Sequence, residues 1–430
     1  MSTQTKRIAF HTMGCKLNFS ETSTLSRDFI RYGFTAVDYK DVADIYVLNS
    51  CSVTNNADKE ARKLIRQAKR RNPLSLIAVT GCYAQLRPQE VGSIEGVDLV
   101  VGTKEKFDLI KYLDTINFKS DLKILRSDID SVKEFIPSYS SGNRTRSFLK
   151  IQDGCNYNCS FCTIPLARGR SRSNSIKKTI KVAKKIEKTG SKEIVLTGVN
   201  IGDFGISRDE SFIDLLIELD RLKKIKRIRI SSIEPNLLTD EIIEFCASSK
   251  KFMPHFHIPL QSGSDKILNA MRRRYDTKVY KDRIKKINDI NPEISIGVDV
   301  IVGFPGESNE NFLETYNFLN ELDITYLHVF SYSERNGTEA VKISEKVQKD
   351  DRSKRSKMLH ILSEKKKGAF YNKFINTKRQ VLFESYKGEY LVGHTDNYIK
   401  VHVKNLNNYN NQLVKINLTK NKGSHMVGCI

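Results

Sequence analysis

The chain has 430 residues, 39% of them hydrophobic, and its 72 Lys and Arg outnumber its 50 Asp and Glu by 22. That length suffices for two or three domains, the apolar fraction is too high for a disordered protein, and no apolar run approaches the ~18 residues of a membrane helix. A polar amino terminus without an apolar signal segment predicts a cytoplasmic protein. The positive charge favours a polyanionic partner such as nucleic acid, although lysine-rich surfaces are often only solvated.

Residues 1–117 alternate short apolar strands with helical segments, which predicts an α/β domain with a doubly wound parallel sheet. The expected strands are 7–12, 44–49, 76–80 and 97–101, and the expected helices are 20–32, 57–71 and 104–113. Cys15, Cys51 and Cys82 each follow one of these strands. Because parallel strands end at one edge of a sheet, we expect the three thiols to converge there. Each alone could instead be a buried small side chain.

Residues 118–144 are polar and are predicted to be a linker. Residues 145–370 then repeat the alternation, and this predicts a partial (β/α)6 barrel with its active site at the carboxyl ends of the strands. The expected strands are 148–152, 194–197, 227–231, 255–259, 295–301 and 326–330, with a helical segment before each of the last five.

Residues 371–430 form short alternating strands after a charged helical segment at 342–367, which predicts a small antiparallel β-barrel. From residue 373 to 430 there are nine Lys and Arg against three Asp and Glu, a net charge of +6. Tyr390, Tyr398 and Tyr409 are interleaved with these charges. A basic barrel with aromatic side chains suits RNA, and a purely structural module is the alternative.

The most specific motif is the loop Cys155-Asn-Tyr-Asn-Cys159-Ser-Phe-Cys162. Cysteines in a chain without a secretion signal favour metal binding over disulfides. Three thiolates are one fewer than a closed tetrahedral site takes, so a metal or cluster bound here would keep one position open for a ligand. A zinc site completed by His255 or His257 is the alternative.

With Phe161 before its last cysteine, this loop resembles the cluster motif of the radical S-adenosylmethionine (SAM) enzymes. In that family the open iron of a four-iron cluster binds SAM, and an electron cleaves SAM to a 5′-deoxyadenosyl radical. Three upstream cysteines, a barrel and a terminal β-module resemble the methylthiotransferases, whose terminal module is the RNA-binding TRAM domain. Residues 12–18 (TMGCKLN), with Glu21, and residues 80–85 (TGCYAQ) are most similar to the tRNA threonylcarbamoyladenosine methylthiotransferases (MtaB type).

The resemblance implies two [4Fe–4S] clusters. Cys155, Cys159 and Cys162 would hold the SAM-binding cluster. Cys15, Cys51 and Cys82 would hold an auxiliary cluster that carries the sulfur to be inserted. The expected SAM-binding residues are Phe161, Thr197, Gly198, Asn200, Glu234, Gln261 and Arg273. Of these, the Arg273 guanidinium fork suits the SAM carboxylate. Helix caps or surface ion pairs are the alternative roles for the polar members of this set.

The implied reaction places a methylthio group on adenine C2 of N6-threonylcarbamoyladenosine beside the anticodon of tRNA. Besides tRNA, it requires an electron donor such as flavodoxin or ferredoxin and a sulfur source, and we expect a monomer. One alternative keeps the chemistry but changes the substrate to isopentenyladenosine in tRNA or a ribosomal-protein side chain. Another is a non-catalytic, metal-stabilised RNA-binding protein.

Overall fold

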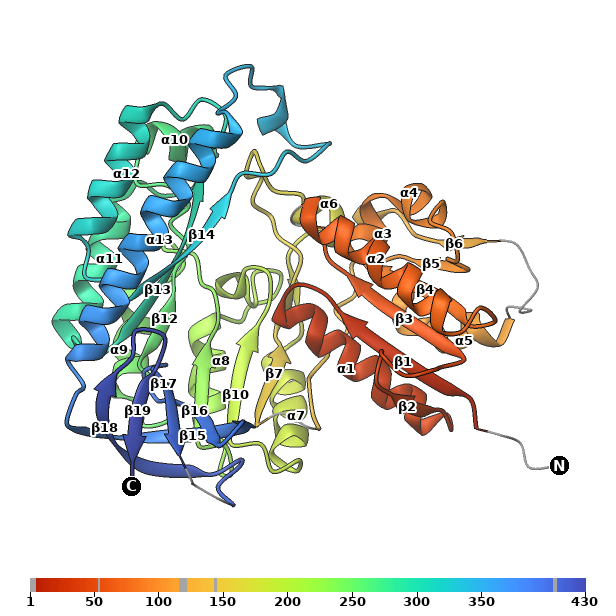
Figure 1. The fold of residues 1–430 in the computed structure, drawn as a ribbon, viewed down its shortest axis with the longest axis horizontal. Helices are drawn as coiled ribbons and strands as arrows, with labels where there is room; N and C mark the ends of the chain where they lie inside the picture. Colours follow the sequence, from red (N-terminus) through yellow and green to blue (C-terminus); the bar gives the residue numbers. More distant parts are fainter. Residues whose placement is uncertain (1–4, 53–54, 116–121, 143–144, 405–407) are drawn as a thin grey trace. The chain divides into compact units, whose positions relative to one another are not determined.

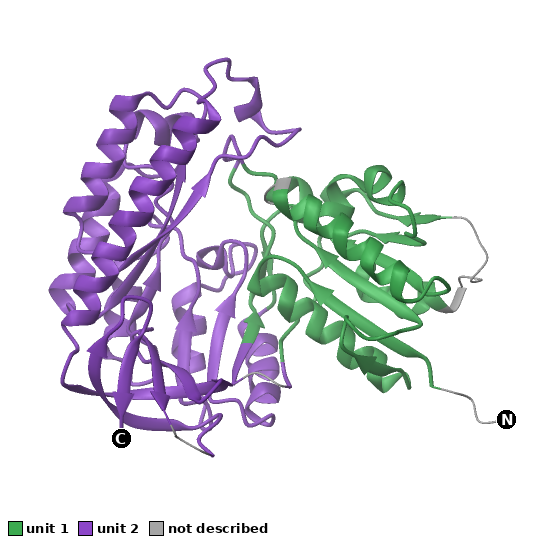
Figure 2. Cartoon of the chain, in the orientation of Figure 1, with its two compact units in different colours: residues 1–140, 148–157, 162–174 green, residues 141–147, 158–161, 175–430 purple. Residues whose placement is uncertain are grey.

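The computed structural model describes residues 5–52, 55–115, 122–142, 145–404 and 408–430. It divides into two compact units that alternate along the sequence (Figure 2). Unit 1 comprises residues 1–140, 148–157 and 162–174, and unit 2 comprises residues 141–147, 158–161 and 175–430. The domain boundaries predicted after residues 117 and 144 fall at 116–121 and 143–144, which lie outside the described residues.

Unit 1 contains a six-stranded parallel sheet with the order β2-β1-β3-β4-β5-β6 (Figure 1). Its strands are β1 (Arg7–Thr12), β2 (Thr35–Val37), β3 (Ile45–Ser50), β4 (Leu76–Gly81), β5 (Leu99–Val101) and β6 (Lys123–Leu125). The central strands β3 and β4 are buried along their whole length, as expected for a sheet covered on both faces. The edge strands β2 and β6 were not predicted, because they are short and none of their residues is fully buried, so they lack the apolar run that marks β5 and the later strand β12 (His255–His257). β6 lies within the segment expected to be a linker.

Helices cover both faces of this sheet. They are α1 (Lys16–Arg31), α2 (Asn55–Arg71), α3 (Cys82–Leu86), α4 (Pro88–Gly92), α5 (Leu109–Thr115) and α6 (Ile164–Arg168), with 3-10 turns η1 (Glu105–Asp108) and η2 (Ile129–Ser131). Val47 packs in one core with Phe29 of α1, whereas the next residue, Leu48, packs in a second core with Ile65 of α2. Successive strand residues face opposite sides of a sheet. The predicted doubly wound arrangement is therefore confirmed.

Six further strands form the parallel array predicted for the barrel. They are β7 (Arg146–Lys150), β10 (Glu193–Thr197), β11 (Arg227–Ile230), β12 (His255–His257), β13 (Ser295–Val302) and β14 (Tyr326–Ser331). They form two three-stranded sheets, β11-β10-β7 and β12-β13-β14, and parallel bridges between Ile228 and Phe252 and between Ser232 and His257 join the two. β7 begins in unit 2 and ends in unit 1, where β8 (Gln152–Asp153) pairs with β9 (Arg172–Ser173).

A helix precedes each of the last five strands of this array, as predicted. The helices of unit 2 are α7 (Ile176–Glu187), α8 (Phe212–Asp220), α9 (Asp240–Ser248), α10 (Asp265–Ala270), α11 (Thr277–Ile290), α12 (Asn309–Glu321) and α13 (Lys349–Asn372), with 3-10 turns η3 (Ile201–Asp203) and η4 (Glu339–Lys342). Local sequence fixes their starts. At α12, for example, the Asn311 amide donates to the Ser308 hydroxyl at 3.2 Å and the Ser308 amide donates to the Asn311 side chain at 3.3 Å.

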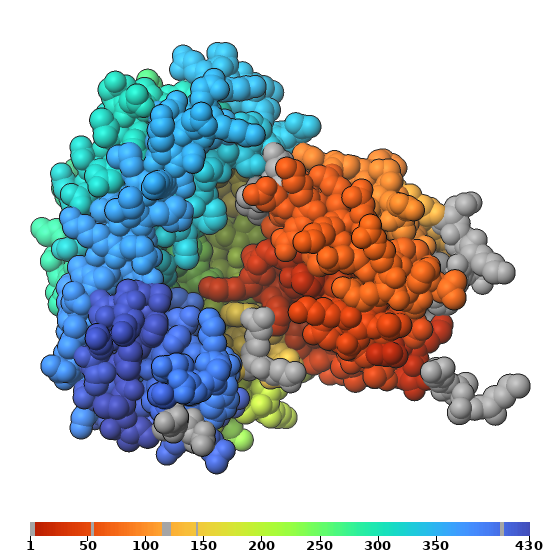
Figure 3. Space-filling model, in the orientation of Figure 1, coloured from red at the N-terminus to blue at the C-terminus, as the bar shows by residue number. Residues whose placement is uncertain are grey.

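The C-terminal strands close into a barrel with the order β15-β16-β17-β19-β18. They are β15 (Thr377–Lys387), β16 (Tyr390–Thr395), β17 (Lys400–Lys404), β18 (Leu413–Asn421) and β19 (Met426–Cys429). The barrel confirms the prediction, except that β17 and β19 pair in parallel. Apolar residues at alternate strand positions, including Val381, Val401 and Ile416, fill its core. In the space-filling view, α13 in light blue and this barrel in dark blue lie side by side within unit 2 (Figure 3).

A turn of the C-terminal barrel contacts the amino end of the parallel array. Arg227, the first residue of β11, donates to the backbone oxygen of His394 at 3.2 Å. Arg229 donates to the backbone oxygen of Asp396 at 3.1 Å, and its guanidinium lies 4.8 Å from the ring centroid of Tyr398. This leaves the carboxyl ends of the strands as the place for a site. None of the described helices has the length and apolarity that crossing a lipid bilayer requires.

Candidate active site

Three cysteines of unit 1 follow three neighbouring parallel strands. Cys15 is the N-cap of α1, just beyond β1, Cys51 directly follows β3, and Cys82 begins α3 directly after β4. Because β1, β3 and β4 are adjacent in the sheet, the cysteines lie at one edge, as predicted. Cys15 is exposed, and Cys51 and Cys82 are buried.

Close packing at Gly14 brings the first two of these loops together. A Cβ at Gly14 would lie 2.7 Å from the Cys51 Sγ and 2.8 Å from its Cβ, closer than real Cβ contacts. Gly14 also has a φ of +83°, a left-handed conformation that glycine adopts without a steric cost. The chain beside Cys15 therefore approaches Cys51 as closely as it does only because residue 14 lacks a side chain.

Cys82 is buried against a guanidinium. Burial raises the pKa of the Cys82 thiol, whereas the positive charge of Arg168 and a hydrogen bond with it oppose that rise. Cys15 lies near enough for its charge to raise the pKa of Cys82 further. A cation beside a buried sulfur favours the thiolate, which is the form that binds metals.

The second group of cysteines lies on the loop between β8 and α6, and each sulfur has an N–H donor. The backbone amide of Tyr157 donates to the Cys155 Sγ at 3.4 Å, and that of Ile164 donates to the Cys162 Sγ at 3.5 Å. In unit 2, the Arg273 side chain donates to the Cys159 Sγ at 3.1 Å. Hydrogen bonds to sulfur stabilise the thiolate and tune the potential of a bound cluster.

Arg273 joins two of the predicted site residues in unit 2. It lies between α10 and α11, where its guanidinium also donates to Glu234 and, at 3.0 Å, to the Tyr275 hydroxyl. Burial raises the pKa of Glu234, and the Arg273 charge opposes this rise. The Tyr275 hydroxyl in turn donates to the backbone oxygens of Pro259 and Leu260, both at 2.9 Å. These contacts link the segments that follow β11 and β12.

Gln261, the residue after Leu260, has a left-handed backbone with a φ of 70°. Two backbone hydrogen bonds hold it there: its amide donates to the Asp299 oxygen at 2.9 Å, and its oxygen accepts from Ile301 at 2.9 Å. Residues other than glycine rarely adopt a left-handed backbone, and those that do are concentrated at functional sites.

The remaining predicted residues lie at two positions of unit 2. Thr197 ends β10, Gly198 and Asn200 follow it, and the Asn200 amide donates to Asp203 at 3.0 Å. Phe161 packs against Phe304, with ring centroids 6.4 Å apart. Thr197 thus ends β10, and Glu234 and Gln261 follow the next two strands of the array, β11 and β12. Within the predicted SAM-binding set, Glu234 pairs directly with Arg273.

Comparison with known proteins agrees with this arrangement. A profile described as "Radical SAM superfamily" matches residues 149–319, and one described as "Uncharacterized protein family UPF0004" matches residues 7–102. "Threonylcarbamoyladenosine tRNA methylthiotransferase MtaB" of Bacillus subtilis (strain 168) is 41% identical over 96% of this chain and 94% of its own. The chain belongs to the radical SAM methylthiotransferase family. The protein of the same name from Aquifex aeolicus (strain VF5) is also 41% identical, over 85% of this methylthiotransferase and 90% of its own chain.

A solved structure extends the comparison to the fold. The radical S-adenosylmethionine methyltransferase TsrM from Kitasatospora setae aligns with this methylthiotransferase with a TM-score of 0.56 and 12% sequence identity. The alignment covers 76% of this chain and 75% of that one. At this identity the likeness concerns the fold alone.

Membership of the radical SAM superfamily implies that the methylthiotransferase uses SAM and a [4Fe–4S] cluster. The donor set fits such a cluster, because Cys155, Cys159 and Cys162 offer three sulfurs that already accept N–H donors. The pair of Glu234 and Arg273 at the Cys159 sulfur adds one negative and one positive group. The Glu234 carboxylate complements the amino group of SAM, and the Arg273 guanidinium complements its carboxylate.

Sequence reasoning missed a buried charged network in unit 1. We call it the Arg168 network; its members are Glu21, Lys106, Lys150, Asp153, Arg168 and Arg172. None of these side chains is more than 8% exposed. The available signal was weak: Lys150 and Asp153 are charged residues in and just after the strand predicted at 148–152.

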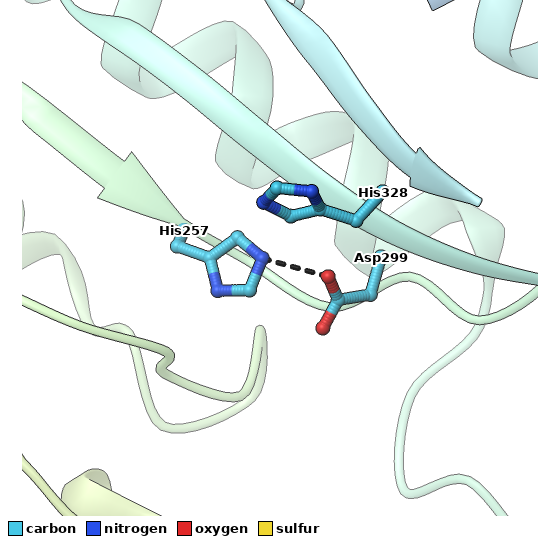
Figure 4. A group of neighbouring side chains, drawn as sticks. All are labelled: His257, Asp299 and His328. Carbon is cyan, nitrogen blue, oxygen red and sulfur yellow. Dashed lines mark hydrogen bonds and ion pairs between the residues drawn. The ribbon is translucent and has the colours of Figure 1, made fainter. Parts of the chain in front are cut away.

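A group of two histidines and a carboxylate was also missed. His257, Asp299 and His328 come from the adjacent strands β12, β13 and β14 and point toward one another (Figure 4). His257 Nε2 lies 2.8 Å from Asp299 Oδ1, and one ligand atom from each residue lies within 4.8 Å of the others. Two histidines and one carboxylate are a known metal-binding set. The hydrogen bond between His257 and Asp299 accounts for the position of these two side chains without a metal, and His328 is exposed.

Proposed function

We propose that this methylthiotransferase converts N6-threonylcarbamoyladenosine beside the anticodon of tRNA to its 2-methylthio derivative. The observation that carries the proposal is the placement of Cys15, Cys51 and Cys82 after three adjacent parallel strands, in a chain that also has the three-cysteine loop. The printed names of relatives that are 41% identical over most of the chain support the choice of nucleoside. So do the residues that surround Cys15 and Cys82 in the sequence.

In this proposal each part of the chain has one task. Residues 1–117 hold the auxiliary cluster, residues 145–370 bind SAM and its cluster, residues 371–430 bind RNA, and 118–144 link the first two. Cys155, Cys159 and Cys162 hold the SAM-binding cluster. A reduced cluster bound there supplies the electron that cleaves SAM. Arg273 binds the SAM carboxylate, because a guanidinium fork matches that group.

The other predicted residues complete the SAM site. Glu234 accepts hydrogen bonds, and Thr197, Gly198, Asn200 and Gln261 present backbone and side-chain groups at the ends of neighbouring strands. Phe161 shields one side of the site and keeps water from the reacting groups. Its packing against Phe304 supports this role.

Cys15, Cys51 and Cys82 hold a second [4Fe–4S] cluster, and the sulfur to be inserted is bound to it. The donor set fits this group: the absence of a side chain at Gly14 allows the loops of Cys15 and Cys51 to approach each other, and Arg168 offers positive charge to Cys82. The reaction further requires a reductant such as flavodoxin or ferredoxin and a source of sulfur. A tRNA substrate is consistent with a cytoplasmic enzyme, which we expect to be a monomer.

The C-terminal barrel is the proposed tRNA-binding module. Its net charge of +6 favours phosphate contacts, and each contact releases counterions. tRNA affinity should therefore fall as salt is raised, with a slope of about −0.9 per neutralised phosphate in duplex regions and about −0.7 in single strands. Replacing the exposed residues Lys415 and Lys420 of β18 with Gln should reduce that slope if they contact phosphates. Measuring affinity across a salt series tests this.

The decisive experiment supplies anaerobically reconstituted protein with reductant, SAM and tRNA that carries threonylcarbamoyladenosine. Nucleoside mass spectrometry should detect a gain of one methylthio group, together with 5′-deoxyadenosine. A gain on isopentenyladenosine tRNA instead would transfer the proposal to the other nucleoside. Absence of 5′-deoxyadenosine under all conditions would favour the non-catalytic RNA-binding alternative and overturn the proposal.

A matched iron measurement tests the two clusters. The reconstituted chain should bind about eight irons, and a variant with Cys155, Cys159 and Cys162 replaced by Ala should bind about four. Replacing Cys246, a buried cysteine of α9 that lies outside both groups, should leave the iron content unchanged. Equal iron in the wild-type chain and the triple variant would contradict the assignment.

A further inference from the structure

Arg168 contacts the elements that carry three of the proposed cluster ligands. It ends α6, and α6 lies beside α3, whose first residue is Cys82 (Figure 1). Its positive charge lies near enough to the Cys82 thiol to oppose the rise in the thiol pKa that burial causes. It also donates to the Asn18 side-chain oxygen at 2.5 Å, on the first turn of the helix that Cys15 caps. Finally, it donates at 2.9 Å to Asp153, two residues before Cys155.

The carboxylates around Arg168 hold it in this position. Glu21, which is fully buried, accepts from Arg168 at 3.1 and 3.2 Å and from Lys150 at 2.8 Å, and it also pairs with Lys106. Burial alone would raise the pKa of Glu21, but these three cations hold it well below its usual value. Glu21 is therefore an ionised carboxylate.

The Arg168 network carries more positive than negative charge. Its four cations, Lys106, Lys150, Arg168 and Arg172, outnumber its two carboxylates, which leaves a formal excess of +2. Moving ions out of water costs several kcal/mol each, and apolar side chains of similar volume often give equal or greater stability. Stability alone is thus a weak explanation for six buried charged side chains. The excess positive charge would be compensated by an anion bound nearby.

We propose that Arg168 is a positioning residue for the auxiliary cluster: it fixes Cys82 relative to the Cys15 helix and supplies positive charge that stabilises the reduced cluster. A four-iron cluster held by three thiolates is anionic and becomes more so on reduction. Net charge and hydrogen bonds to sulfur set the reduction potential of such clusters. The inference rests on the proposed function, because it requires that Cys15, Cys51 and Cys82 hold a cluster.

The geometry predicts opposite effects from the two partners of one ion pair. Replacing Arg168 with Gln removes a positive charge beside Cys82 and should make reduction less favourable. Replacing Glu21 with Gln removes a negative charge from the same network and should make reduction more favourable. A purely structural role would give two changes in the same direction, because both substitutions break the same pair.

The test uses the full chain with Cys155, Cys159 and Cys162 replaced by Ala, so that only the auxiliary cluster forms. The midpoint potential is measured by titration with EPR detection, and iron per chain is measured on the same samples. In this background we expect R168Q to reduce the equilibrium constant for reduction at least tenfold, which is 59 mV for a one-electron couple, and E21Q to raise it. R168K retains the charge and should shift the potential less than R168Q.

The matched control is R229Q in the same background. Arg229 is likewise a buried arginine, paired at 3.0 Å with the buried carboxylate of Glu193, but it lies in unit 2. Its replacement should leave the potential of the auxiliary cluster unchanged. Should R168Q fail to fold, E21Q decides alone: a raised potential supports the inference and an unchanged one overturns it.

The outcomes separate this inference from the function on which it depends. A background that binds no iron overturns the proposed auxiliary cluster and, with it, the role of Arg168. If the background binds iron but R168Q and E21Q leave the midpoint potential unchanged, or shift it in the same direction, only the role of Arg168 is overturned. Opposite shifts with an unshifted R229Q support it.

Discussion

The Arg273 guanidinium donates a hydrogen bond to the Sγ of Cys159 at 3.1 Å, although the two residues are 114 positions apart in the sequence. The same guanidinium pairs with Glu234. Burial raises the pKa of the Cys159 thiol, and the Arg273 charge opposes that rise. Arg273 therefore lies between Cys159, a proposed ligand of the SAM-binding cluster, and Glu234, which is expected to contact SAM.

Replacing Arg273 with Gln should weaken SAM binding about 10- to 100-fold, because a hydrogen bond to a charged group contributes about 1.5–3 kcal/mol. Equilibrium dialysis with SAM and the rate of 5′-deoxyadenosine formation measure the effect. The neighbouring Arg272 provides the control. Its side chain is 48% exposed, and its ion pair with the exposed Glu339 is long, at 3.9 Å. R272Q should change SAM affinity less than twofold. Equal losses in the two variants would remove Arg273 from the site.

The G14A variant should lose the auxiliary cluster while keeping the SAM-binding one. The new Cβ would lie 2.7 Å from the Cys51 Sγ, so the loop must move away from the thiol that it now contacts. We expect iron to fall from about eight to about four per chain, with 5′-deoxyadenosine formation retained and methylthio transfer lost.

The control for this substitution is G33A in the same unit. Gly33 has a φ of +91°, similar to that of Gly14, but a Cβ there would have no neighbour within 4 Å. G33A therefore carries the same backbone cost without the collision. If G33A also loses half of its iron, backbone strain rather than contact with Cys51 explains the result for Gly14.

The sequence reveals the cysteines of this site more readily than their surroundings. Cys15, Cys51 and Cys82 are predictable because each follows an apolar strand, and the ends of parallel strands meet at one edge. The Arg168 network is not predictable from the sequence, because Glu21 and Arg168 are 147 positions apart and meet only through the packing of α1 and α6. The edge strands β2 and β6 were not predicted because, unlike the equally short β5 and β12, they contain no fully buried residue and so show no apolar run. Tyr398 was grouped with the barrel aromatics that suit RNA, and it lies against Arg229 and His255.

His402 should remain neutral at physiological pH, so it adds no positive charge for RNA binding. Its ring stacks on that of His425 with centroids 3.8 Å apart. Burial and, to a smaller extent, the charges of His425 and Lys400 together lower the pKa of His402 to about 4. Histidine-selective NMR titration should find that the assigned His402 ring stays neutral far below pH 6.5, and H425Q should raise the pKa of His402.

The same shift predicts a dependence of stability on pH. Unfolded His402 binds a proton near pH 6.5, whereas folded His402 does so only near pH 4. The stability that the neutral ring contributes is therefore complete above pH 6.5 and is lost as the pH falls toward 4. The thermal midpoint of the wild-type chain should fall over this interval more than that of H402Q. Identical pH profiles for the two proteins would contradict this account.

Tyr398 tests how the C-terminal barrel is held to the parallel array within unit 2. Its ring centroid lies 4.6 Å from that of His255 and 4.8 Å from the Arg229 guanidinium, and its backbone is left-handed with a φ of 69°. Y398A should reduce the free energy of unfolding by about 2–3 kcal/mol, because aromatic and cation–π contacts are each worth about 0.5–1.5 kcal/mol beyond the buried area.

Comparison of Y398A with Y398G then isolates the backbone contribution. A left-handed conformation costs a residue other than glycine roughly 1–2 kcal/mol, so Y398G should be about 1 kcal/mol more stable than Y398A despite its greater flexibility when unfolded. Urea unfolding measures both, with Y386A as the control, since Tyr386 is on the same barrel and 49% exposed. A Y398G protein less stable than Y398A would mean that no strain is stored at this turn. The aromatic contacts with Arg229 and His255 would then account for the whole effect.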